Sequence, residues 1–429
     1  MVLSRGFMSM AREEMTTIEL EAETVGEVPA PVTESSRPTS IELFAGAGGL
    51  ALGVERAGFR TLATVERDRW ACDTIRENAA AGHELVSAWT VIESDVREHD
   101  WSRYGDDVAL VSGGPPCQPF SMGGRGLAAE DPRDMFPATA DVLAAVRPRA
   151  FIIENVRGLT RPSLALYYEY VRLRLSMPEM RPRRNETWPE HLERMRRSSE
   201  RGGGSLRYRV TPTLLDAADY GVPQRRHRVF MVGFREDIDV DWSFPRVTHS
   251  QLALIRDQWV TGDYWERNGV SKQKRPEAPS ASVIRRAAGE HPPLRPWVTV
   301  REALQGLPEP GSRAARSIPN HVYQAGARSY TGHTGSPLDQ PSKALKAGGH
   351  GVPGGENMVL RPDGSVRYFT VRESARLQTF PEDYVLHGSW GEAMRQLGNA
   401  VPVDLARVVA QGVHDAIVNG TNRSAGGRA

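Results

Sequence analysis

The sequence predicts an α/β fold in which a parallel β-sheet is covered by helices on both faces. Two observations carry this prediction. Short apolar runs alternate with segments in which apolar residues recur at helical spacing, and the helical segments have the length of crossovers between parallel strands. The predicted strands are 39–45, 61–66, 106–114 and 150–155, and the predicted helices are 50–59, 68–80 and 137–149.

The later elements are less regular. Between about 160 and 205 the periodicity fades into Arg-rich sequence with prolines and three consecutive glycines, which indicates an insertion or a partly mobile arm. The stretches 207–217 and 227–234 are apolar enough to be strands that return to the sheet. Residues 236–297 are irregular, and residues 332–357 are rich in Gly and Pro, so we expect loops in both.

Two later segments carry the same signal for a helix start. Each places Thr three residues before Glu, Thr299 with Glu302 and Thr370 with Glu373, which is the capping-box pattern. We therefore predict two helices that begin in the same way, rather than a repeat architecture.

Composition limits the class of protein. The 429 residues are 39% hydrophobic and 25% charged, which is ordinary for a globular protein of two or three domains. We find no run of 18 apolar residues and no secretory signal, so a membrane span is not expected. The two cysteines, Cys72 and Cys117, cannot form a disulfide framework or a four-cysteine zinc site, which favours a reduced, cytoplasmic protein.

Charge is distributed unevenly, although the formal net charge is only +1. Residues 1–38 hold three Arg and seven Glu and predict a flexible acidic tail. Residues 157–235 hold 17 Arg against eight Asp and Glu. Such a basic block is either the footprint of phosphate binding or a solvated surface.

A glycine-rich turn is the first segment with a chemical signal. The strand at 39–45 leads into Gly46, Gly48 and Gly49 and then into a helix, so the backbone can approach a ligand at the helix N-terminus. Glu66, at the end of the next strand, is placed for ribose hydroxyls, and Asp95 for an adenine edge. Together they favour nucleoside-cofactor binding over an unliganded turn.

The loop around Cys117 is the second signal. Cys117 follows two prolines and a glycine pair at the end of an apolar run, so it lies on a stiff loop at the carboxyl edge of the sheet. A nucleophilic cysteine needs nearby positive charge or proton removal, because its ordinary pKa is about 8.5. The alternative is a buried cysteine that packs as a small apolar side chain.

Three further segments add polar groups. Glu154 ends an apolar strand and can protonate a heterocyclic nitrogen if burial raises its pKa; otherwise it caps the next turn. Arg226 and Arg228 alternate on an incoming strand and are expected to face a phosphate, a base carbonyl or Glu154, unless they are plain surface. Gly398 and Asn399 interrupt two helical stretches and are placed to close over a cofactor.

The sequence resembles the DNA cytosine-5 methyltransferase family, of the prokaryotic restriction-modification type, in five segments. They are FAGAGG at 44–49, PPCQPFS at 115–121, ENV at 154–156, QRRHR at 224–228 and GNAVP at 398–402. The resemblance covers residues 39–234 and 298–412. It implies a Rossmann-like class I methyltransferase sheet flanked by helices, with a smaller, loop-rich target-recognition domain.

The resemblance also implies roles for single residues. Cys117 would be the nucleophile, Glu154 the group that protonates the base, Arg228 its assistant and Arg226 a support of the site. S-adenosylmethionine would be the cofactor, and the residues that fall at its contacts are Phe44, Ala47, Gly48, Gly49, Glu66, Asp95, Val96, Gly114 and Asn399. The residues that fall at DNA contacts are Gln118, Ser121 and Arg225.

The implied domains are a tail at 1–38, a large catalytic and cofactor-binding domain at 39–234, a target-recognition domain at 235–366, and a returning segment at 367–429 with a mobile tail from about 420. The implied partner is double-stranded DNA from which the target cytosine is flipped out. No metal and no membrane are expected, and the location would be the cytoplasm, at the nucleoid. A restriction endonuclease would be the functional partner.

Two other functions stay open. A tRNA cytosine-5 methyltransferase would share every catalytic segment, and a non-catalytic DNA-binding homologue would share the scaffold. The large, Trp- and Gly-containing region favours DNA, and the intact set of Cys117, Glu154 and Arg228 favours an enzyme. An amino-methyltransferase would show a loop similar to Asp-Pro-Pro-Tyr instead of PPCQ.

Overall fold

The computed structural model describes residues 37–116, 134–201, 206–289, 292–331, 333–347 and 357–426. The predicted acidic tail lies outside the described residues except for its last two positions. Cys117, Gln118 and Ser121 also lie outside them.

A seven-stranded sheet forms the centre of residues 37–426, with the strand order β3-β2-β1-β4-β5-β7-β6. The strands are β1 (Thr39–Leu43), β2 (Arg60–Glu66), β3 (Thr90–Glu93), β4 (Val108–Gly113), β5 (Ala150–Val156), β6 (Tyr208–Asp216) and β7 (His227–Arg235). The first five are parallel, and β7 pairs antiparallel with both β5 and β6. The predicted α/β class is therefore confirmed, and 208–216 and 227–235 return to the sheet as predicted.

Helices cover both faces of this sheet, because its central strands bury side chains in both directions. The helices that accompany the sheet are α1 (Gly49–Arg56), α2 (Arg69–Ala80), α3 (Phe136–Val146), α4 (Ala165–Ser176), α5 (Trp188–Arg201) and α12 (Val403–Gly426). On β5, Phe151 and Ile153 pack with residues of α3 and α4, whereas Ile152 packs with residues of α1 and α12. This alternation is what a strand buried on both faces requires.

The range 160–205 differs from the expectation of an insertion or a mobile arm, because it contains two helices that pack on the core. In α4 the side chains of Tyr167, Tyr170, Val171 and Arg174 are all buried, which is helical spacing. Arg174 obscured the pattern: its guanidinium lies inside, where it donates hydrogen bonds to the carbonyls of Pro178 and Met180.

Local ion pairs engage some of the arginines in this region. Arg196 of α5 pairs with Glu169 of α4 at 2.5 Å, and Arg194 pairs with Glu186 at 2.7 Å. These contacts tie α5 to α4 and to the turn before it. Part of the basic block is therefore engaged within the protein.

Short elements occupy the chain between β7 and the last helices. They are β8 (His249–Ser250), α6 (Gln251–Arg256), a π-helical turn η8 (Asp257–Thr261), α7 (Asp263–Arg267), α8 (Ala281–Ala288), β9 (Arg295–Pro296), α9 (Val300–Ala303), β10 (Ser336–Pro337), β11 (Met358–Leu360), β12 (Val366–Tyr368), α10 (Val371–Leu377) and α11 (Trp390–Asn399). Short 3₁₀ turns also occur, at Trp101–Asp107, Arg157–Thr160, Pro162–Leu164, Ala217–Tyr220, Lys272–Lys274 and Ala314–Ser317. The helices α6, α7 and α8 were not predicted; α6 and α7 are too short to show a periodicity, and α8 lies in a stretch with several prolines that was expected to be loop.

Aromatic side chains organise the first part of this region. Leu254, Tyr264, Trp265 and Trp297 form a buried cluster against which Trp259 packs. The preceding residues Trp242 and Phe244 pack on the core at the α12 face of the large sheet. The domain boundaries at 235 and 366 stay predictions.

Both predicted capping boxes are present. Thr299 begins α9 and Thr370 begins α10, and in each case the Thr side chain accepts from the backbone N–H of the Glu three residues on. Each Glu side chain in turn accepts from the backbone N–H of its Thr. This prediction is confirmed.

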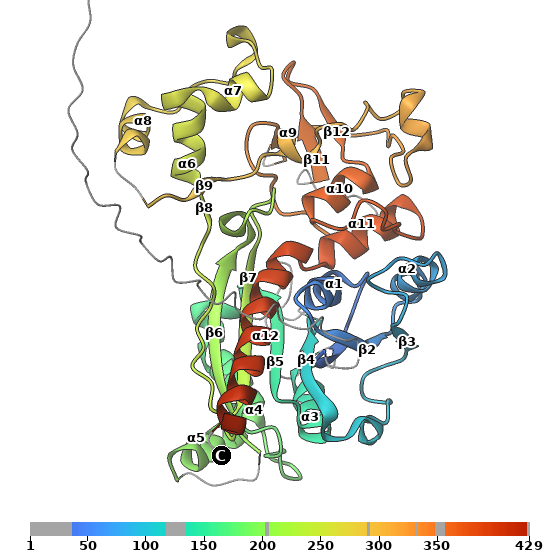
Figure 1. Cartoon of the computed structure of the whole chain (residues 1–429), viewed down its shortest axis with the longest axis vertical. Helices are drawn as coiled ribbons and strands as arrows, with labels where there is room; N and C mark the ends of the chain where they lie inside the picture. Colours follow the sequence, from blue (N-terminus) through green and yellow to red (C-terminus); the bar gives the residue numbers. More distant parts are fainter. Residues whose placement is uncertain are drawn as a thin grey trace, which may run out of the picture. The chain divides into compact units, whose positions relative to one another are not determined.

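The last helix packs against the first. α12 runs beside α1 along one face of the sheet (Figure 1), and Leu405, Val409 and Val413 join the core that contains Leu50 and Val54 of α1. No helix among the described residues is long and apolar enough to cross a bilayer.

We predict that Gly53→Ala weakens this contact. A Cβ atom at Gly53 would lie 2.4 Å from the Cβ of Ala406 and 2.6 Å from the carbonyl oxygen of Val403. Overpacking of this kind costs about 1–3 kcal/mol of unfolding free energy. The control is Gly391→Ala in α11, where the closest atom would be 3.9 Å away and Ala improves helix propensity. Denaturant unfolding of both variants measures the difference, and equal stability of the two would contradict the predicted contact.

Candidate functional site

The candidate site lies where the strand order reverses. β1 and β4 are neighbours, yet the chain leaves β1 toward β2 on one side and leaves β4 toward β5 on the other. In open α/β sheets, ligands bind outside the carboxyl ends of the strands at such a switch point. Two cavities occur there, and Phe44, Glu66 and Pro116 line both of them.

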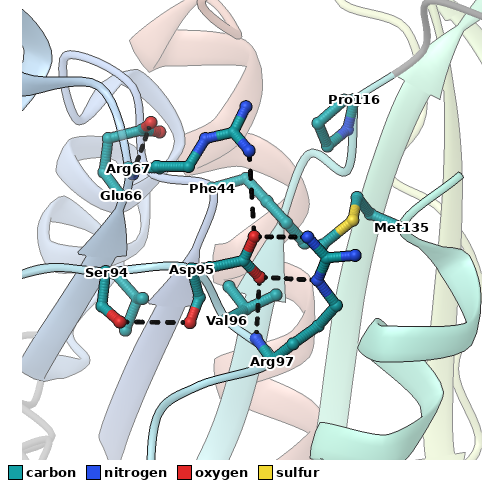
Figure 2. Close-up of a pocket in the computed structure, with 10 residues that line it drawn as sticks. Phe44, Glu66, Arg67, Ser94, Asp95, Val96, Arg97, Pro116 and Met135 are labelled. Carbon is teal, nitrogen blue, oxygen red and sulfur yellow. Dashed lines mark hydrogen bonds and ion pairs between the residues drawn. The ribbon is translucent and has the colours of Figure 1, made fainter. Parts of the chain in front are cut away.

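The first cavity has a volume of about 190 Å³ and combines apolar walls with carboxylates. Its apolar lining comes from Phe44, Val65, Val96, Pro116 and Met135. Its polar lining comes from Glu66, Arg67, Ser94, Asp95 and Arg97. Figure 2 shows Phe44 and Met135 beside the Asp95 carboxylate. Such a cavity suits a flat apolar group that carries hydrogen-bond donors on its edge.

Asp95 is held ionised in this cavity. Arg97 donates from Nε to Oδ1 at 2.9 Å and from Nη2 to Oδ2 at 2.7 Å, and Arg67 lies 3.8 Å from Oδ2 (Figure 2). These hydrogen bonds to Arg97 lower the pKa of Asp95 to about 2. Asp95 is therefore a hydrogen-bond acceptor at neutral pH.

Glu66 holds the glycine-rich turn in place. Its Oε2 accepts from the backbone N–H of Gly46 at 2.9 Å, and its Oε1 accepts from the N–H groups of Arg67 and Asp68 at 2.8 and 2.7 Å. A carboxylate has about four lone-pair sites, so Glu66 can accept further hydrogen bonds from a ligand.

The glycine-rich turn needs its glycines for two reasons. Gly48 has φ of +85° as the residue before α1, a conformation that favours glycine. A Cβ on Gly49 would lie 2.5 Å from the carbonyl oxygen of Val401. Phe44 also has a positive φ, +54°, at the edge of both cavities. A positive φ at a non-glycine residue strains the backbone, and such residues cluster at ligand-binding sites.

The second cavity, of about 300 Å³, contains the paired groups at the ends of β5 and β7. Glu154 is 6% exposed, and its Oε1 lies 2.6 Å from Nε of Arg228. Burial raises the pKa of Glu154, while the charges of Arg228 and Arg226 oppose that rise. A Cβ on Gly114 would lie 3.0 Å from Oε2 of Glu154, so the glycine leaves room above the carboxyl group.

Arg226 stands behind this cavity and ties together the segments that line it. It is 1% exposed and donates to the carbonyl oxygens of Leu345 at 2.9 Å, Gly398 at 2.6 Å and Ala400 at 2.9 Å. Asn399, between the last two, lines the second cavity. Arg226 therefore positions other segments around the cavity. Its supporting role in the reaction stays a prediction.

Asn155 fixes the approach to the Cys117 segment. Its Nδ2 donates to the carbonyl oxygen of Pro115 at 3.1 Å, which holds the Pro-Pro turn at the cavity. Pro116 lines both cavities and is the last described residue before position 117. The structure thus describes the chain up to the residue bonded to Cys117.

Comparison with known proteins gives the family of this chain. The C-5 cytosine-specific DNA methylase family matches residues 39–171 and 200–414. The chain belongs to this family. The reaction of the family is methyl transfer to carbon 5 of cytosine in DNA, so the chain is a DNA cytosine-5 methyltransferase.

Individual relatives agree with the family. The Type II methyltransferase M.Eco47II of Escherichia coli is 31% identical over 382 residues, which cover 87% of this chain and 78% of that protein. M.PspPI of a Psychrobacter species is 29% identical over 394 residues, which cover 89% of this chain and 80% of that protein. A candidate DNA modification methyltransferase from an E. coli prophage shares the fold, with a TM-score of 0.53 at 21% identity over 89% of this chain and 99% of that one.

The predicted site residues of this methyltransferase fall into three groups. Those that line a cavity are Phe44, Glu66, Asp95, Val96, Gly114, Glu154, Arg228 and Asn399. Those that shape the surroundings are Ala47, Gly48, Gly49 and Arg226, among which Ala47 accepts from the Tyr384 hydroxyl at 3.0 Å. Arg225 lies apart, half exposed, pairing with Asp216 and stacking on Trp297.

Sequence reasoning missed several cavity residues. Arg97 and Arg67 flank the carboxylates Asp95 and Glu66, and their closeness in sequence was the available signal. Glu42 was also missed, although it is the charged residue within the run 39–45. Within the ranges that the structure describes, no group of three or more His, Cys, Asp or Glu side chains could hold a metal ion.

We predict that Arg226→Lys strongly destabilises the protein. A single ammonium group cannot reach all three carbonyl oxygens, and each buried acceptor left unsatisfied costs about 1–3 kcal/mol. The control is Arg209→Lys, because exposed Arg209 also donates to two carbonyl oxygens, those of Ile238 and Val240. Water can replace these hydrogen bonds at the surface. Thermal unfolding compares the two variants. Similar melting temperatures would contradict the bridging role of Arg226.

Proposed function

We propose that this chain methylates carbon 5 of a cytosine flipped out of a specific site in double-stranded DNA, through a covalent adduct between Cys117 and carbon 6. The observation that carries the proposal is the buried pair of Glu154 and Arg228 in the second cavity. The first cavity, which contains Asp95, shares lining residues with it. Pro116 lies at both, and Cys117 is bonded to it.

S-adenosylmethionine is the proposed cofactor, and the residues present fit its nucleoside. The ionised Asp95 suits the amino group of adenine, Glu66 retains acceptor capacity for ribose hydroxyls, and Phe44 offers an apolar face. When bound, the cofactor supplies a methyl group on a positively charged sulfur. Glu66 and Asp95, at the ends of β2 and β3, would orient the group, and Phe44, at the end of β1, would shield its nucleoside from water.

Glu154 is proposed to act on ring nitrogen 3 of the cytosine. As the thiolate of Cys117 bonds to carbon 6, electrons of the C5=C6 bond shift toward nitrogen 3, which takes a proton there. Burial raises the pKa of Glu154, so that its carboxyl group can carry a proton to nitrogen 3 although Arg228 and Arg226 oppose that rise. Arg228, at 2.6 Å, then stabilises the carboxylate that remains. The addition makes carbon 5 nucleophilic, so that carbon 5 would take the methyl group that the cofactor supplies. Loss of the hydrogen on carbon 5 as a proton then drives out the thiolate, which restores the C5=C6 bond and completes the reaction.

The substrate is proposed to be DNA because the family acts on DNA. The target cytosine is proposed to be flipped out because a base stacked in the duplex cannot reach the cavity. Gln118, Ser121 and Arg225 are the proposed contacts, and residues 235–366 form the proposed target-recognition domain. The half-exposed guanidinium of Arg225, above Trp297, supports this proposal for Arg225. The relatives are named Type II methyltransferases, which supports pairing with a restriction endonuclease and a location at the bacterial nucleoid.

Asp95→Ala tests the cofactor site. Loss of hydrogen bonds to a charged group costs about 1.5–3 kcal/mol, which corresponds to roughly 10- to 150-fold weaker binding of S-adenosylmethionine. The control is Asp100→Ala, which removes an exposed carboxylate close in sequence that bonds only locally, to Ser102. Isothermal titration calorimetry measures both, and wild-type affinity of the Asp95 variant would refute the assignment.

Cys117→Ser tests the proposed nucleophile. We expect loss of methyl transfer and loss of covalent trapping on DNA that contains 5-fluorocytosine, while the folded state persists. Cys72→Ser is the matched control: burial raises the pKa of the Cys72 thiol to about 12, so it stays protonated and inert. Bisulfite sequencing of DNA from expressing cells gives the methylated base and site. A fully active Cys117 variant would overturn the adduct.

A further inference from the structure

A buried carboxyl group that the proposed mechanism does not use lies in the same cavity as Glu154. Glu42, on β1, is 2% exposed and lines the second cavity. In the sheet register Glu42 adjoins Ser112 of β4, which adjoins Ile152 of β5. Since side chains two residues apart on a strand face the same way, Glu42 and Glu154 lie on the same face of the sheet.

The surroundings of Glu42 contain a hydroxyl donor but no cation partner. The Ser112 hydroxyl donates a hydrogen bond to Oε2 of Glu42. The charged groups around the cavity from β2, the start of α2, β5, β7 and α11 are Glu66, Asp68, Glu154, Arg228 and Arg395. Arg228 is engaged by Glu154 and Arg395 by Asp68, and no described residue forms an ion pair with Glu42.

Glu42 is therefore a neutral acid at neutral pH. Burial raises its pKa to about 8, against the lowering effect of the Ser112 hydrogen bond, and the nearby charge of Glu154 raises it further. Glu154 has a cation partner, so its ionised form is the better stabilised of the two. Two coupled carboxyl groups titrate as a pair, and this pair holds a proton that resides on Glu42.

The geometry points to Glu42 as a positioning residue for the reaction, one that forms with Glu154 a coupled carboxyl pair and keeps a proton in the base site. This inference rests on the proposed function of Glu154. As nitrogen 3 takes a proton from Glu154, the proton on Glu42 passes to Glu154: the O–H bond of Glu42 breaks, an N–H bond forms on nitrogen 3, and both carboxyl groups are left ionised, with Arg228 as the cation partner of Glu154. The proton returns to the pair when the thiolate leaves and nitrogen 3 is deprotonated.

The test is the pH dependence of single-turnover methyl transfer with saturating DNA and S-adenosylmethionine. The wild type should lose rate as the pH rises through about 8, where Glu42 ionises. Glu42→Gln keeps a similar shape but holds no titrating proton, so the alkaline loss of rate should move to lower pH by about one unit or more. The KM for DNA should not change, because the residue does not contact DNA in this proposal.

Ser112→Ala should shift the profile in the opposite direction. Its hydroxyl lowers the pKa of Glu42, so its removal should move the alkaline loss of rate to higher pH. The matched control is Ser40→Ala, which removes another buried hydroxyl of the same sheet, one that bonds to Thr61 at 3.2 Å. If the role of Glu42 is merely structural, Glu42→Gln and Ser112→Ala will lower the rate but leave the pH of the alkaline loss unchanged. That result would overturn the inference.

Infrared spectroscopy of the folded protein without DNA gives a readout independent of activity. The wild type should show a protonated-carboxyl band that titrates near pH 8 and that is absent from Glu42→Gln. Absence of this band from the wild type overturns the inference, whatever the activity. Failure of the wild type to methylate DNA contradicts the proposed function instead, while the band still reports the proton on Glu42.

Discussion

The buried carboxyl group of Glu154 is the constraint around which the site is built. An ionised carboxylate in a low-dielectric interior is costly unless an opposite charge and hydrogen bonds compensate. Here Arg228 supplies the charge from the antiparallel strand β7, and Gly114 leaves space above the group. The insertion of β7 between β5 and β6 brings this cation to the end of β5.

A second arginine in the same segment does different work. Arg226 is two residues before Arg228, yet it donates to backbone carbonyls from two segments that lie far away in sequence. The guanidinium of Arg228 places a positive charge beside Glu154. The guanidinium of Arg226 connects the segments around the cavity through hydrogen bonds. Arginine suits both tasks, because its planar group offers five donors in fixed directions.

The sequence predicted four of the five parallel strands, the glycine-rich turn and both capping boxes, because each depends on local pattern. It did not predict α4, because Arg174 occupies an inward position of that helix and broke the apolar periodicity. It could not show that Arg226 bonds to Leu345 and Gly398, since such contacts depend on tertiary structure. Glu154 was one of three groups that Arg226 and Arg228 were expected to face, and Arg228 alone pairs with it.

The pairing of α1 with α12 has a consequence for how the chain is made. The apolar side of α1, including Leu50 and Val54, is covered by residues that lie more than 300 positions later in the sequence. During synthesis that surface stays open until α12 leaves the ribosome, so all seven strands, the last of which ends at Arg235, are made before α12 can cover this face of the sheet. Closure of the fold, and with it the wall contributed by Gly398 and Asn399, is thus a late event in biogenesis.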